Sequence, residues 1–180
     1  MSVAFDNTFL TLMINPGVPA RPNPATNLPT THLRLRIDAL LDDLSKRRIK
    51  VLIPTPAYAE ALTVTGDLAK VQGVLGGIAA MELVPFDARS AIEYGIMTRT
   101  AKESGDKRAG ALGDWQRIKF DRQIVAVAVA HGASVLYTDD ENQSKFAELV
   151  GLAVKHTWEL DLPDKYAQMD ILERNEKAKT

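Results

Sequence analysis

Short apolar runs alternate with segments of helical periodicity along the chain, and this alternation limits the possible folds most strongly. The runs are residues 2–6 and the stretches KVLIP, MELV, ASVLYT and LAVKHT. Each is short enough for a strand and is bounded by proline, glycine or acidic residues. Strands that alternate with helices favour a parallel sheet with helices on both faces. We therefore expect an α/β protein with a three-layer α/β/α arrangement, in which LAVKHT is an edge strand.

Helical segments fill most of the intervals between these runs. In the first long one, Leu33, Ile37, Leu40 and Leu44 follow helical spacing, and Thr31 is a plausible N-cap. A second helix is predicted to follow a cap at Thr55, with Pro56 in its first turn, and a short helical turn after the first strand. The full set of predicted helices is 31–49, 54–64, 67–80, 88–104, 114–131 and 142–151.

A proline-rich segment interrupts this pattern near the N-terminus. Residues 15–31 contain the five prolines of NPGVPARPNPATNLPTTH, too many for a helix. Long loops inside compact domains are typically functional or disordered. We assign residues 1–157 to one domain that includes this loop, and residues 158–180 to a C-terminal helical extension or tail.

Charge and cysteine content exclude several kinds of site. The formal net charge is −1, so a polyanionic partner needs a local patch of cations or bound metal ions. The chain has no cysteine, which excludes disulfides, thiolate zinc sites and cysteine nucleophiles. The longest apolar run, 124–130, is too short to span a bilayer. With no signal-peptide pattern either, we expect a cytoplasmic protein that does not bind membranes.

Acidic residues follow two of the predicted strands directly. Asp6 ends the first strand, and Asp139 and Asp140 end the SVLYT strand. Binding sites in parallel sheets form at the carboxyl ends of strands, so these acids are expected on one rim. Asp6 could alternatively serve only as a cap for the next turn.

Two further acids lie on faces that should be apolar. Asp121 shares its helical face with Ile118, Ile124, Val125 and Ala128, and Glu60 lies between Ala57 and Val64. We assign no basic residue to either of these two apolar stripes, although Asp121 could pair with an arginine from elsewhere in the chain. A lone buried carboxylate is costly unless it is paired. Oxygen ligands suit Mg²⁺ or Mn²⁺, so we expect a divalent metal site.

Together these segments resemble the PIN-domain nuclease family. The resemblance covers residues 3–156 and rests on Asp6, on Glu60 in TPAYAEAL, on Asp121 in FDRQIVAVAVAHGA and on the segment LYTDD. It implies a central parallel sheet of four or five strands and metal-dependent cleavage of RNA. Many bacterial relatives are VapC-like toxins of type II toxin–antitoxin modules, which implies a possible cognate antitoxin and a homodimer.

The resemblance also implies roles for individual residues. Asp6, Glu60 and Asp121 match acidic positions of the family directly, and Thr138 matches a position whose hydroxyl orients the acids or the attacking water. In the pattern Thr-x-Asp, Asp140 is the expected metal ligand, but Asp139 or both remain open. Glu60 is the acid expected to position or deprotonate the water.

Basic residues leading up to Asp121 provide candidate RNA contacts. They are Lys107, Arg108, Arg117, Lys119 and Arg122, and a solvated helix face is the alternative interpretation. Two other functions remain open. The stretch FDNTFLTL is loosely similar to phosphatases of the haloacid dehalogenase type, although Thr8 stands where their second acid is expected. The second open function is that of a catalytically silent PIN-like module, which binds RNA or assembles with partners.

Overall fold

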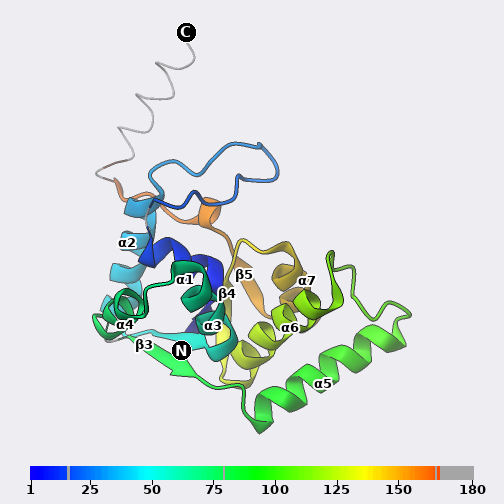
Figure 1. The fold of residues 1–180 in the computed structure, drawn as a ribbon. Coiled ribbons are helices and arrows are strands. Elements are labelled where there is room, and N and C mark those ends of the chain that lie inside the picture. The colour runs from blue at the N-terminus through cyan, green and yellow to red at the C-terminus, as the bar shows by residue number, and fades with distance from the viewer. Residues whose placement is uncertain (16, 79, 165, 167–180) are drawn as a thin grey trace.

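The computed structural model describes residues 1–15, 17–78, 80–164 and 166, and its centre is a five-stranded parallel sheet (Figure 1). The strand order is β3-β2-β1-β4-β5, with every neighbouring pair parallel. The strands are β1 (Ser2–Phe5), β2 (Lys50–Pro54), β3 (Met81–Val84), β4 (Ala133–Tyr137) and β5 (Ala153–Lys155). All five predicted strands therefore form, and β5 lies at an edge as expected.

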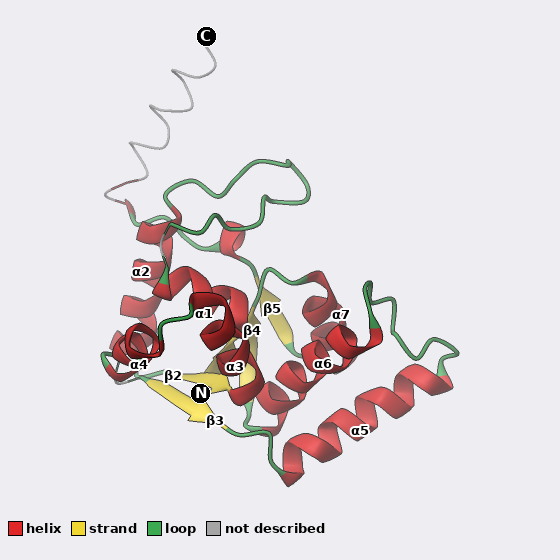
Figure 2. Cartoon of the chain, viewed as in Figure 1, coloured by secondary structure: helices red, strands yellow, loops and turns green. Residues whose placement is uncertain are grey.

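Helices cover both faces of the sheet and make three layers (Figure 2). One side carries α1 (Asn7–Ile14), α2 (Leu33–Lys46), α3 (Thr55–Thr65) and α4 (Leu68–Gly76). The other carries α5 (Ala88–Glu103), α6 (Trp115–Ala130) and α7 (Glu141–Leu149), and a short 3₁₀ helix, η1 (Thr157–Glu159), follows β5. Among the described residues, no helix combines the length and apolar character needed to cross a membrane.

The first strand shows how side-chain alternation supplies both layers. Val3 and Phe5 pack into the core beneath α1 to α4, whereas Ala4 packs into the core beneath α5 to α7. Successive residues of a strand point to opposite faces. Because both faces are covered, β1 is almost fully buried, as expected for a central strand of a parallel sheet.

Helix α6 follows its predicted bounds closely. The Asp114 carboxylate accepts hydrogen bonds from the backbone N–H groups of Gln116 and Arg117 and caps the helix. The helix ends at Ala130, and Gly132 takes a positive φ of 76° in the turn to β4.

At three helix starts the structure differs from the prediction. The segment after β1 is the eight-residue helix α1 rather than a single turn, because a run of large apolar residues packs it onto the sheet. Helix α2 begins at Leu33, preceded by His32 in a left-handed conformation, so Thr31 is not its N-cap. Thr55 is already helical, and its hydroxyl accepts a hydrogen bond from the Phe86 backbone N–H instead of capping α3.

The proline-rich loop and the predicted C-terminal helical extension or tail are described to different extents. Within 15–31, an isolated antiparallel bridge joins Asn23 to Leu28. After residue 157, Leu160 is buried in the same core as α1 and α2, so the packing of the domain continues beyond the predicted boundary. The predicted tail at residue 165 and at 167–180 lies outside the described residues.

Candidate active site

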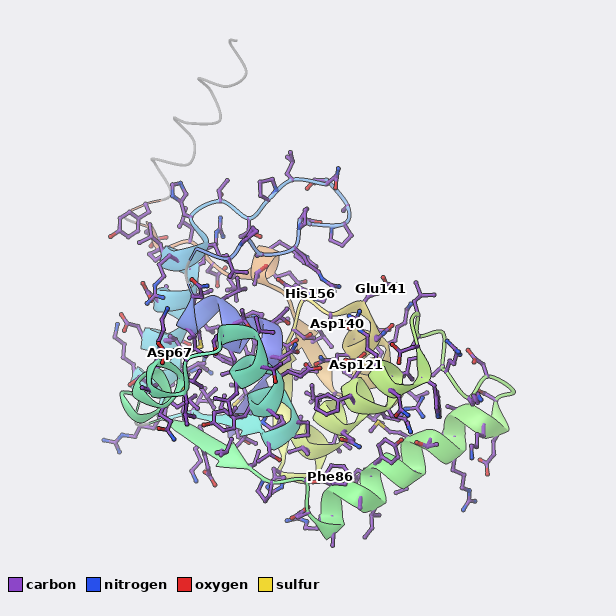
Figure 3. The ribbon with its side chains drawn as sticks, in the orientation of Figure 1. Asp67, Phe86, Asp121, Asp140, Glu141 and His156 are labelled. Carbon is purple, nitrogen blue, oxygen red and sulfur yellow. The ribbon has the colours of Figure 1, made fainter. Side chains whose placement is uncertain are left out.

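The acids predicted at strand ends meet at the carboxyl edge of the sheet, between β1 and β4. Thr138 links the two strands there: its hydroxyl donates to Asp6 Oδ2 at 2.6 Å and accepts the Asp140 backbone N–H at 2.9 Å. Figure 3 places Asp140 beside Asp121, at the end of the sheet where α6 and α7 begin. Residues from β1, β4 and α6 therefore share one rim, as the topology requires.

Asp6 is fully buried and uses both carboxylate oxygens. Oδ1 accepts the Phe9 backbone N–H at 2.9 Å and caps α1, while Oδ2 accepts the hydroxyls of Thr8 and Thr138. Asp6 therefore caps α1. These hydrogen bonds favour the ionised form, but burial outweighs them and raises the pKa of Asp6 to about 7.

Asp140 connects the start of α7 to two arginines. Its Oδ1 accepts the backbone N–H groups of Asn142 and Gln143, at 2.8 and 3.2 Å. Its Oδ2 lies 2.8 Å from Arg117 Nη2 and 3.5 Å from Arg21 Nη2. One oxygen of Asp140 therefore caps a helix, and the other faces cations.

Asp121 is buried on the apolar stripe where the sequence pattern places it. It is 3% exposed, and its Oδ2 accepts from the Asn142 side-chain amide at 3.2 Å. Burial, and secondarily the charge of Asp140, raise the pKa of Asp121 to about 6. The same Oδ2 lies 3.9 Å from Arg117 Nε. The assignment of no basic residue to this stripe was wrong, since Arg117 stands one helical turn before Asp121.

Glu60 lies across a pocket from these acids. The pocket has a volume of about 420 Å³ and is lined by Asn7, Glu60, Arg117, Asp121 and Asp140, among others. Burial, followed by the nearby charge of Asp121, raises the pKa of the half-buried Glu60. The structure thus brings Glu60, Asp121 and Asp140 to one cavity from three separate helices or helix starts.

Asp139 points away from this pocket. Its Oδ1 accepts the Thr157 backbone N–H at 2.8 Å, and its Oδ2 accepts the Thr157 hydroxyl at 2.7 Å. Burial raises the pKa of Asp139 as well. Of the two acids left open by the pattern Thr-x-Asp, Asp140 lines the pocket, and Asp139 fastens the chain after β5 to the end of β4.

The donor chemistry of the pocket fits a hard divalent cation. It offers carboxylate oxygens without competing thiols, and burial disfavours the charge on Asp6 and Asp121. Within the described ranges, however, no group of three or more His, Cys, Asp or Glu residues stands close enough together to hold a metal ion. Arg117, rather than a fourth acid, is the charged side chain that contacts both Asp121 and Asp140 among the described residues.

The predicted RNA-contacting cations do not form one set. The prediction for Arg122 is wrong: the side chain is fully buried, donates to the Thr98 hydroxyl and the Lys107 carbonyl, and packs on the Phe146 ring. Lys107 is exposed and lies over the Trp115 ring. The remaining predicted cations also reach the surface: Arg108 is exposed, Lys119 is partly exposed, and the Arg117 side chain is half exposed.

The sequence interpretation missed several residues that contact the acids, among them Arg21 and Asn142. Arg21 approaches from the proline-rich loop, 119 positions from Asp140, and no local pattern signals this contact. Asn142 joins Asp121 to the loop before α6, because its side chain exchanges two hydrogen bonds with the Leu112 backbone. The sequence signal for Asn142 was its position two residues after Asp140, because the first turn of the helix that follows β4 lies at the carboxyl edge of the sheet.

Comparison with known proteins places the fold. No family model matches the chain, and no curated protein matches its sequence. A chain in the crystal structure of VapBC2 from Rickettsia felis, bound to a DNA fragment from their promoter, matches with a TM-score of 0.57 and 19% identity. The match covers 87% of this chain and 98% of that chain. A chain in the structure of DNA-bound VapBC from Salmonella typhimurium matches with a TM-score of 0.53, 16% identity and the same coverage.

This chain shares their fold. The expected three-layer α/β/α, PIN-like arrangement with a parallel sheet of four or five strands is therefore confirmed, with five strands.

Proposed function

We propose that the protein is a ribonuclease that hydrolyses RNA phosphodiester bonds with the help of Mg²⁺ or Mn²⁺. The observation that carries this proposal is the shared pocket of Glu60, Asp121 and Asp140, with Asp6 buried behind it and tied to it through Thr138. Acids that are buried together without equal positive charge are the arrangement expected of a metal-dependent hydrolytic site.

Each acid has a distinct proposed role. Asp6, Asp121 and Asp140 would hold the cation, and Asp139 would position the chain through Thr157 instead of binding metal. When bound, the metal would lower the pKa of a water molecule and offset charge on the scissile phosphate. Glu60 is partly exposed across the pocket and has a raised pKa, which suits it to accept a proton from the attacking water.

The remaining charged residues suit a polyanionic substrate. The exposed cations Lys107 and Arg108, together with Lys119, lie on α6 or on the segment that leads into it. We propose that they contact RNA phosphates, whereas Arg122 serves the core. The phosphatase alternative is less well supported, because Thr8 is hydrogen bonded to Asp6 and because that reaction leaves Glu60 and Asp121 without a role.

A toxin role in a toxin–antitoxin module is the biological setting we propose. The matched structures are of VapBC bound to DNA. The pocket acids also lie in the sequence segments that resemble the PIN-domain nuclease family. We further propose a cognate antitoxin as a partner, a homodimer as the assembly and the cytoplasm as the location.

The test compares wild type with Asp121→Asn on a labelled single-stranded RNA in Mn²⁺ and in EDTA. Wild type should cleave only with metal and leave 5′-phosphate products, and Asp121→Asn should lower the rate by at least about 1,000-fold. Glu103→Gln, an exposed site on α5, is the matched control and should cleave normally. Cleavage by Asp121→Asn at the wild-type rate would refute the proposal.

A further inference from the structure

One carboxylate oxygen at the rim is contacted by two guanidinium groups. Asp140 Oδ2 lies 2.8 Å from Arg117 Nη2 and 3.5 Å from Arg21 Nη2. The other oxygen of Asp140 is occupied by the cap of α7. The part of this carboxylate that could bind a cation from the pocket is therefore already paired with cations of the chain itself.

Arg117 stands in an unfavourable place for a positive charge. It lies in the first turn of α6, where the helix dipole favours anions, and its backbone N–H is bonded to the capping Asp114. Its side chain reaches over Asp121, 3.9 Å away, to Asp140. The acids of the pocket, rather than the helix, thus stabilise the position of this guanidinium.

The Arg117 side chain is also free to leave. It is 52% exposed and lines both the 420 Å³ pocket and a neighbouring one of about 310 Å³. The second pocket is also lined by Arg21 and Asn142. A guanidinium displaced from Asp140 would therefore have solvent-accessible space beside it without any change in the core.

Arg21 brings the proline-rich loop to the same point. Its Nη1 donates to the Asp139 carbonyl at 3.2 Å, and its Nη2 reaches Asp140. The loop 15–31 is thereby tied by its one arginine to the end of β4. The longer contact and the half-exposed side chain make this the weaker of the two pairs.

We propose that Arg117, assisted by Arg21, is an internal counterion that occupies the cation position of the acidic pocket and must leave it when a divalent cation binds. Arg117 is in this sense a positioning residue that sets the metal affinity of the site. The inference rests on the proposed function, because it requires Asp121 and Asp140 to be metal ligands.

Competition follows from the shared atom. A guanidinium at 2.8 Å from Asp140 Oδ2 fills the approach that a metal ion needs to bind the same oxygen. Binding of metal must then include the free energy of breaking the two ion pairs. The positive charge of Arg117 also partly offsets the repulsion among the carboxylates of Glu60, Asp121 and Asp140.

The experiment is calorimetric titration of the full chain with Mn²⁺ alone, without RNA. Arg117→Gln should bind Mn²⁺ about tenfold more tightly than wild type, and Arg21→Gln about twofold more tightly. Arg99→Gln is the matched control, because it removes the same charge from an exposed pair with Glu103 on α5 and should leave the affinity unchanged. Arg117→Lys, which keeps the charge, should stay close to wild type.

The outcomes separate this inference from the proposed function. Equal or weaker Mn²⁺ binding by Arg117→Gln, while wild type binds and cleaves, overturns the counterion role and leaves the ribonuclease intact. Absence of Mn²⁺ binding in wild type and in all four variants overturns both the counterion role and the metal site. Circular dichroism checks that each variant folds. If Arg117→Gln does not fold, Arg117→Lys replaces it in the test, and weaker Mn²⁺ binding by Arg117→Lys than by wild type would contradict the counterion role.

Discussion

Two exposed aspartates, Asp87 and Asp114, and the buried Asp6 cap helices with nearly the same local geometry, but their pKa values shift in opposite directions. Asp87 and Asp114 cap α5 and α6 at the surface, and the backbone N–H groups they accept lower the pKa of each carboxyl. Asp6 caps α1 in the same way, yet burial raises its pKa to about 7. The capping hydrogen bond is the same, so the difference in pKa comes from the burial of Asp6 at the edge of the sheet.

The direction of the pKa shift separates an acid that only caps a helix from a candidate functional acid. A cap at the surface gains from the helix dipole and stays hydrated. A cap at the carboxyl edge of β1 loses its hydration and stands near other acids, so the fold bears an electrostatic cost there. That cost is what a bound cation would offset.

The largest expected effect concerns the buried cap. In EDTA the folded protein binds a proton at Asp6 between about pH 4 and pH 7, whereas the unfolded chain does not, so stability should fall as the pH rises through this interval. Asp6→Asn keeps the cap and removes this titration. Urea unfolding at pH 4.5, 6 and 8 should show Asp6→Asn becoming more stable relative to wild type as pH rises, by at most about 4 kcal/mol.

Asp87→Asn is the control for this experiment, because its pKa is lowered and it titrates below the interval. Its stability should follow wild type across the three pH values. If the stabilities of Asp6→Asn and wild type change in parallel with pH, the raised pKa of the buried Asp6 carboxyl is contradicted.

A smaller effect is expected at the exposed cap. Asp87→Ala removes the carboxylate that accepts from the Ser90 backbone N–H and hydroxyl, and should lower the melting temperature at pH 7 by about 2–4 °C. The lowered pKa of Asp87 means that this loss is present above about pH 4 and disappears as the carboxyl is protonated at lower pH. Differential scanning calorimetry at pH 7 and pH 3 measures it.

RNA cleavage should also distinguish the exposed cap Asp87 from the acids of the pocket. Asp87→Ala should cleave at the wild-type rate, since this cap lies on α5 and lines no part of the acidic pocket. Loss of cleavage in Asp87→Ala would show that the surface and buried caps do not differ in function.

Much of the fold and part of the site follow from sequence pattern alone. The five strands are recognisable because each is a short apolar run, and Asp121 stands out because helical spacing places it among Ile118, Ile124 and Val125. Such signals are local, so a single sequence carries them.

The contacts that pattern could not supply are mainly nonlocal. Arg21 reaches Asp140 only because the proline-rich loop brings it to the residues that follow β4. Arg122 and Lys119 are both basic residues of one helix, but only packing against Phe146 and Thr98 shows that Arg122 is buried. Arg117 lies four residues before Asp121 on the same face of α6, so this pair, unlike the others, follows from helical spacing alone.

The most direct measurement is anomalous diffraction from crystals of the full chain soaked in Mn²⁺. The account predicts an anomalous peak among the carboxylates of Asp6, Asp121 and Asp140, with the Arg117 guanidinium moved off Asp140. Crystals that hold Mn²⁺ elsewhere, with Arg117 still on Asp140 and no peak in the pocket, would contradict it.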